Sequence, residues 1–262
     1  MIRTFLISTT IISTVIFTSC NNKTDNNSEE QITIDNSPTA DNEDSLGISV
    51  NGNDSMKQIA SYPRNVILTG LNNHRLVSIY KLKQTKNTTH DLKILRSYDY
   101  EDDDNRSEYE HFMPGIDILY GFNLLNIAHY DLSKEKLNFF FEHPVLIKTL
   151  YYPSFNQDSI NKKPINRDYY MISVYNEDTN HDSLINKKDL RHFFLFDQSN
   201  STKTQIIPAD YSVIRSQYDS QNDNMYIFAR KDLNKNGQQD NEEPIHIFWF
   251  NLKTPGVAKQ LY

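Results

Sequence analysis

Oxygen-bearing side chains alternate along residues 232–243, which read Asp-Leu-Asn-Lys-Asn-Gly-Gln-Gln-Asp-Asn-Glu-Glu. Carboxylate or amide oxygens stand at positions one, three, five, nine and twelve, as Asp232, Asn234, Asn236, Asp240 and Glu243. Oxygen donors at this spacing suit Ca²⁺, which takes about six to eight ligands and favours a bidentate carboxylate at position twelve. The segment therefore predicts a calcium site, to which the backbone carbonyl of Gln238 at position seven contributes.

Gly237 at position six strengthens the prediction, because the chain must turn sharply there and a Cβ is disfavoured. Residues 232–243 resemble an EF-hand calcium-binding loop over all twelve positions. The resemblance implies bound Ca²⁺ as the only cofactor.

A second segment, residues 178–189, has oxygen donors at the same five positions. They are Asp178, Asn180, Asp182, Asn186 and Asp189, with the carbonyl of Leu184 at position seven. Ser183 replaces the glycine and should strain the turn by roughly 1 kcal/mol. Asp189 is shorter than the usual glutamate, so we expect this loop to bind more weakly. For both loops, a solvated Asn/Asp-rich turn without metal is the alternative.

The segments on either side of the two loops are short, aromatic and β-branched, which is typical of strands. Residues 169–175 and 225–229 precede the loops, and residues 193–196 and 245–250 follow them. A true EF-hand places its loop between two helices. The strand context therefore favours a calcium-stabilised scaffold over a calcium sensor that opens on binding.

The N-terminus has the features of an export signal: Arg3, a mainly apolar stretch over residues 5–17, and small residues before Cys20. It resembles a bacterial lipobox, which implies a signal peptide over residues 1–19 and lipid attachment to Cys20. An ordinary signal peptide or a weak membrane anchor is the alternative. Asn21 implies sorting to the outer membrane of the bacterial cell envelope, by resemblance to Gram-negative lipoproteins.

Residues 20–60 are rich in Asn, Asp, Ser and Thr and predict a lipidated, disordered linker. Residues 61–262 then form one β-rich domain carrying both loops. The formal net charge of −7 argues against nucleic acid as a partner, because such binding needs a basic face. It also gives no attraction to anionic headgroups, so we expect attachment to the membrane through the lipid alone.

Four segments share an apolar strand that ends near an aromatic residue; they are residues 77–82, 126–132, 194–197 and 248–252. They predict an all-β domain of about four repeated antiparallel units. The arrangement resembles the blades of TolB-like and WD-type β-propellers, and a two-sheet β-sandwich is the alternative.

The sequence contains no HExxH pair, no GxSxG elbow and no glycine-rich phosphate loop. We therefore expect a structural or binding module and not an enzyme, with an envelope protein or a glycan as its partner. A glycan-acting or other hydrolytic enzyme is the alternative, because a pair of catalytic carboxylates needs no local motif.

Overall fold

The computed structural model describes residues 48–49, 59–82 and 109–262. The predicted signal peptide, Cys20 and most of the predicted linker lie outside these residues. Within the described part, every regular element is a β-strand and every pairing between named strands is antiparallel. In the same ranges, no helix is long and apolar enough to cross a membrane.

The described strands, in chain order, are β1 (Ile48–Ser49), β2 (Ser61–Leu68), β3 (His74–Lys81), β4 (Tyr109–Met113), β5 (Ile116–Asp131), β6 (Lys136–Phe139), β7 (Leu146–Pro153), β8 (Asp158–Ile160), β9 (Lys163–Ile165), β10 (Tyr169–Tyr175), β11 (Leu184–Ile185), β12 (His192–Asp197), β13 (Lys203–Gln205), β14 (Tyr211–Asp219), β15 (Asn224–Lys231), β16 (Ile245–Asn251) and β17 (Lys259–Gln260). The largest sheet has the order β13-β12-β10-β7-β5-β3-β2, and β4 and β6 also pair with β5. A second sheet has the order β14-β15-β16-β17, while β8 pairs with β9 and β1 with β11.

The long strand β5 belongs to two parts of the large sheet. Its first half pairs with β4 and β7, and its second half pairs with β3 and β6. The register shifts between Tyr120 and Leu124, next to Gly121. A Cβ on Gly121 would lie 2.7 Å from the backbone oxygen of Ile147, so only glycine permits this close approach.

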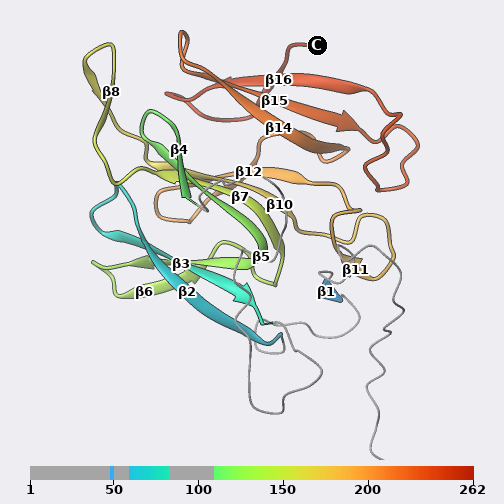
Figure 1. Cartoon of the computed structure of the whole chain (residues 1–262), viewed down its shortest axis with the longest axis horizontal. Helices are drawn as coiled ribbons and strands as arrows, with labels where there is room; N and C mark the ends of the chain where they lie inside the picture. Colours follow the sequence, from blue (N-terminus) through green and yellow to red (C-terminus); the bar gives the residue numbers. More distant parts are fainter. Residues whose placement is uncertain (1–47, 50–58, 83–108) are drawn as a thin grey trace, which may run out of the picture. The chain divides into compact units, whose positions relative to one another are not determined.

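Strand β10 is buried along its whole length because it has a hydrophobic core on each face. Tyr170, Ile172 and Val174 point into the core shared with β3, β5, β7 and β12. Tyr169 and Met171 point to the opposite face, where they pack with residues of the small sheet such as Met225 and Phe248. Figure 1 shows the small sheet above β12, β10 and β7, with β2, β3 and β6 below them. Alternating side chains on one strand thus hold three layers together.

The prediction of an all-β, antiparallel fold is confirmed in the described residues, but a propeller-like arrangement is not. The first three repeat segments fall on β3, β5 and β12 of the one large sheet, and the fourth falls on β16. No sheet of the described part closes on itself, and a β-sandwich fits these layers. An aromatic residue near the end of a strand is common to many antiparallel sheets, so the repeat did not identify blades.

Four residues of the predicted linker, Ile48, Ser49, Ile59 and Ala60, are part of the folded structure. Ile48 and Ser49 of β1 pair with Ile185 and Leu184 of β11. The side chain of Ile48 is only 2% exposed and packs in a small core with Leu125 and Ile185. Strand β2 begins at Ser61, where the β-rich domain was expected to begin.

Candidate metal centre

Each predicted calcium loop connects two strands that are hydrogen-bonded neighbours. The first loop, residues 178–189, joins β10 to β12, and the second loop, residues 232–243, joins β15 to β16. The strands predicted on both sides of the loops are therefore confirmed. Because the two strands beside each loop are paired, the distance between the ends of the loop is fixed.

In the second loop, side-chain oxygens accept hydrogen bonds from the loop's own backbone. The Asp232 carboxylate accepts from the amides of Asn236 and Gly237, at 3.2 and 3.0 Å. Asn234 Oδ1 accepts from the Asn236 amide at 2.9 Å, and Asn236 Oδ1 accepts from the Gln238 amide at 2.8 Å. These bonds wrap the chain around its own oxygen donors.

The first loop repeats this pattern position by position. The Asp178 carboxylate accepts from the amides of Asp182 and Ser183, at 3.1 and 2.9 Å. Asn180 Oδ1 accepts from the Asp182 amide at 3.1 Å, and Asp182 Oδ1 accepts from the Leu184 amide at 2.9 Å. The side chains at positions one, three and five therefore accept hydrogen bonds from the same loop positions in both loops.

The carboxylate at position twelve also has the same backbone partner in both loops. Glu243 Oε1 accepts from the amide of Leu233 at position two, at 2.8 Å. Asp189 Oδ1 accepts from the amide of Thr179, also at position two and also at 2.8 Å. In each loop the last residue thus closes the turn onto the second.

The backbone angles of the two loops agree where the chain turns most sharply. At position four, His181 and Lys235 have φ values of 59° and 57°. At position six, Ser183 and Gly237 have φ values of 69° and 71°. The strain predicted at Ser183 therefore has a geometric basis, since a non-glycine residue there adopts the left-handed conformation.

In the second loop, two asparagine side chains face the carboxylate at position nine. The amide nitrogens of Asn234 and Asn236 donate to Asp240 Oδ2, at 2.9 and 2.7 Å. These bonds lower the pKa of Asp240, the bond from Asn234 most, so this carboxyl is an anion at neutral pH. To bind one cation together with Asp240, the side-chain amides of Asn234 and Asn236 would have to rotate so that their oxygens, and not their nitrogens, face Asp240.

Asp189 at the end of the first loop is less suited to coordination than Glu243. It is fully buried, and burial raises the pKa of its carboxyl. Besides the Thr179 amide, it accepts from the amides of Asn180 and Asn186, at 3.3 and 2.8 Å. Both of its oxygens are therefore committed to the backbone. These bonds disfavour a bidentate role for Asp189, and the weaker affinity of this loop stays a prediction.

The remaining predicted ligands lie as follows. Asn186 is buried, and its Oδ1 accepts from the amide of Lys188 at 2.7 Å. Leu184 belongs to β11, and Gln238 forms an isolated antiparallel bridge with Asp189. Among the described residues, no three His, Cys, Asp or Glu side chains group together to hold a metal ion. A cation in either loop would thus depend on asparagine and backbone oxygens as well as carboxylates.

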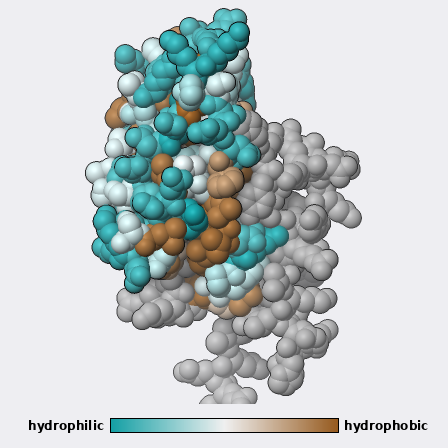
Figure 2. Space-filling model, turned by 90° about the vertical axis from the view of Figure 1, so that its left-hand side faces the viewer, coloured by the Kyte–Doolittle hydropathy of each residue, from teal (hydrophilic) through white to brown (hydrophobic). Residues whose placement is uncertain are grey.

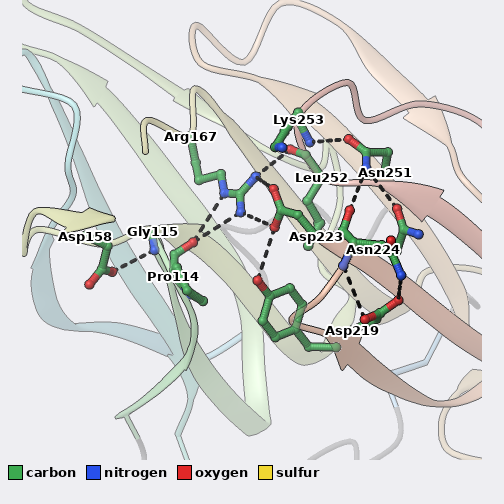
Figure 3. Close-up of polar contacts among 12 residues, drawn as sticks. Pro114, Gly115, Asp158, Arg167, Asp219, Asp223, Asn224, Asn251, Leu252 and Lys253 are labelled. Carbon is green, nitrogen blue, oxygen red and sulfur yellow. Dashed lines mark hydrogen bonds and ion pairs between the residues drawn. The ribbon is translucent and has the colours of Figure 1, made fainter. Parts of the chain in front are cut away.

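Within the described part of the chain, the sequence did not indicate one deeply buried ion pair. The guanidinium of Arg167, before β10, forms two hydrogen bonds with the Asp223 carboxylate in the turn between β14 and β15, at 3.1 and 2.7 Å (Figure 3). Arg167 also donates to the carbonyls of Pro114 and Leu252, and the Tyr218 hydroxyl donates to Asp223. All the N–H donors of the Arg167 guanidinium are therefore bonded within the protein, and these bonds connect the two sheets.

No signal in the sequence distinguished these two residues. Arg167 stands in an ordinary polar connection, and Asp223 resembles any acidic residue of a turn. Arg167 and Asp223 are 56 residues apart in the chain and meet only because the two sheets pack together.

A surface cavity of about 440 Å³ lies between the turn after β5 and the turn after β12. Asp131, Lys134, Phe139 and Asn200 are among its lining residues, and the Phe139 side chain is 42% exposed. Figure 2 shows one face of the molecule, on which hydrophilic residues adjoin a continuous apolar area. None of the predicted calcium ligands lines this cavity.

A comparison with models of known protein families found no match for the chain, and a comparison with curated proteins found none either.

Proposed function

We propose that the chain is a calcium-binding lipoprotein of the bacterial cell envelope whose β-sandwich domain serves as a structural or binding module. The observation that supports this most directly is the likeness of the two loops. They are identical only at positions one and three, yet they share left-handed residues at positions four and six. In both loops the side-chain oxygens at positions one, three, five and twelve also accept hydrogen bonds from backbone amides of the loop. The oxygen pattern, not overall sequence identity, sets their common conformation.

The charges of the loops supply a physical reason for a cation. The second loop contains Asp232, Asp240, Glu242 and Glu243, and the first contains Asp178, Asp182 and Asp189. Like charges within one twelve-residue loop repel one another, and a bound cation reduces that cost. The strand context favours a calcium ion that stabilises the domain over one that switches its shape.

Melting with calcium against chelator tests this proposal. With a dissociation constant of about 10⁻⁴ M, as in extracellular calcium modules, and about 1 mM calcium, each site adds roughly 1.4 kcal/mol. In a domain of about 200 residues, one site should raise Tm by about 3–6 °C and two by about 6–12 °C. Far-UV circular dichroism of the folded protein should be the same in both conditions.

Two variants provide matched controls for the melting test. Asp240→Asn should remove the contribution of the second loop. Asp219→Asn changes an aspartate that caps the β14–β15 turn, outside both loops, and should leave the calcium shift intact. A wild-type shift below about 2 °C would show that calcium does not stabilise this domain.

The anchor is the second part of the proposal. The residues before Cys20 support acylation of its sulfur and retention at the outer membrane. The Cys20→Ala protein should appear in the soluble fraction after a salt wash, whereas a fully membrane-bound variant would rule out the lipid. A pull-down of the lipidated protein from its native membrane would then identify the envelope protein or glycan that it binds.

A further inference from the structure

The two loops touch each other, and one side chain outside the predicted ligand set makes the contact. Thr179, at position two of the first loop, donates its hydroxyl hydrogen to the carbonyl of Gly237 in the second loop, at 2.6 Å. The same hydroxyl oxygen accepts from the amide of Leu190 at 2.8 Å. The hydroxyl also lies 3.2 Å from Asp189 Oδ1, and the shorter contact assigns its one hydrogen to the Gly237 carbonyl. Its neighbours in and beside the first loop thus hold the hydroxyl in place.

The backbones of the loops approach so closely that Gly237 has no room for a side chain. A Cβ on Gly237 would lie 1.9 Å from the backbone oxygen of Thr179 and 2.9 Å from the nitrogen of Asn180. Ser183 has nearly the same φ at the same position of the first loop. Because serine is accommodated at that φ, the left-handed backbone alone does not require glycine, and at Gly237 the contact with the first loop adds the requirement.

Two further contacts join the loops beside this point. Asp189, which accepts from the Thr179 amide, forms an antiparallel bridge with Gln238. Ser212 on β14 accepts from the amide of Arg191, just after the first loop, and donates to Gln239 in the second. The segment 237–239 of the second loop is therefore held from the first loop's side at three successive residues.

We infer that Thr179 is a positioning residue that makes calcium affinity at the second loop depend on the first. The inference rests on the function proposed above, in which the Gln238 carbonyl is a ligand. Gly237 O belongs to the peptide group that leads into Gln238, so the hydroxyl that holds it also orients the next carbonyl. Loss of the hydroxyl leaves the second loop's own ligands in the chain but frees the direction in which that carbonyl points.

Thr179→Val tests the inference, because valine keeps the shape of the side chain and removes the hydroxyl. A neutral hydrogen bond is worth about 1 kcal/mol, so calorimetric titration should show calcium affinity of the tighter site reduced about threefold to tenfold. Thr179→Ser retains a hydroxyl and should stay within about twofold of wild type. Thr202→Val is the matched control, since it removes a hydroxyl that bonds Asp197 in a turn outside both loops.

The outcomes separate this inference from the proposed function. If the wild-type protein binds no calcium, the function fails, and the inference fails with it. If the wild type binds and Thr179→Val binds equally well, only the inference is overturned. Equal losses in Thr179→Val and Thr179→Ser would also overturn it, because the hydroxyl would not be the cause. Should the valine variant not fold, Thr179→Ala compared with Thr179→Ser gives the same readout.

Discussion

Replacement of Arg167 by methionine should strongly destabilise the protein. Methionine has a similar length but no donor, so the Asp223 carboxylate would remain buried without its cation. The two side chains are 1% and 2% exposed, and little water can reach the carboxylate to compensate. The Pro114 carbonyl would lose both of its bonds from the guanidinium, and the Leu252 carbonyl would keep only the bond from the Tyr169 hydroxyl.

The size of the effect follows from the burial. Breaking a buried ion pair by removing one partner costs about 3–5 kcal/mol, chiefly because an uncompensated charge is left inside. For a domain of about 200 residues this corresponds to a fall in Tm of about 6–20 °C. The double variant Arg167→Met/Asp223→Leu should be less destabilised than the two single changes added together, because it leaves no lone charge.

Urea unfolding followed by circular dichroism would measure the change in the free energy of unfolding. Lys134→Met is the matched control, because Lys134 pairs with Asp131 at 3.2 Å but its side chain is 68% exposed. Exposed pairs are worth about 0–1 kcal/mol, so this variant should stay near wild type. If Arg167→Met loses less than about 1.5 kcal/mol, the buried pair does not lock the two sheets together.

Three further predictions concern single side chains. Burial, and next the stacked ring of His74, lower the pKa of His129. As pH falls below about 6.5, the unfolded chain therefore takes up this proton before the folded protein does, and the free energy of unfolding should decrease. In His129→Gln, the free energy of unfolding should depend less steeply on pH between 5 and 7. Glu243→Gln should weaken calcium binding at least about tenfold. Asp189→Asn should mainly lower stability in chelator, by about 1–3 kcal/mol, because an amide nitrogen would face backbone N–H groups. Calorimetry and melting of both variants test this, and a larger loss of calcium affinity in Asp189→Asn would contradict it. Gly237→Ala should destabilise by more than about 1 kcal/mol, since its Cβ would meet a backbone oxygen at 1.9 Å, while Ser183→Gly should be neutral or stabilising by up to about 1 kcal/mol; similar unfolding midpoints for the two would contradict this reasoning.

Local features of the structure were predictable from the sequence, and long-range ones were not. The strands beside the loops were recognised because their apolar, aromatic and β-branched residues are a local signal. Strand β10 has the predicted limits, Tyr169–Tyr175. The oxygen spacing of the loops was likewise local and identified the residues that wrap around each turn.

The pairing of strands depends on contacts between distant residues, which composition and periodicity do not record. The register shift of β5 next to Gly121 and the burial of β10 between two hydrophobic cores depend on such contacts. The contact of Thr179 with Gly237 spans 58 residues of chain. Four similar segments therefore suggested separate blades, whereas in the described residues three of them lie in the one nine-stranded sheet.

If Cys20 carries the proposed lipid, the pairing of β1 with β11 limits how far the folded domain can stand from the membrane. A free linker over residues 20–60 would reach roughly 130–145 Å at full extension. Because Ile48 is already fixed against Ile185, the free length from a lipid on Cys20 ends there, at roughly 90–100 Å. In the proposed lipoprotein, a pull on the anchor would therefore act first on β11 inside the first loop, before it acts on β2 at the edge of the large sheet.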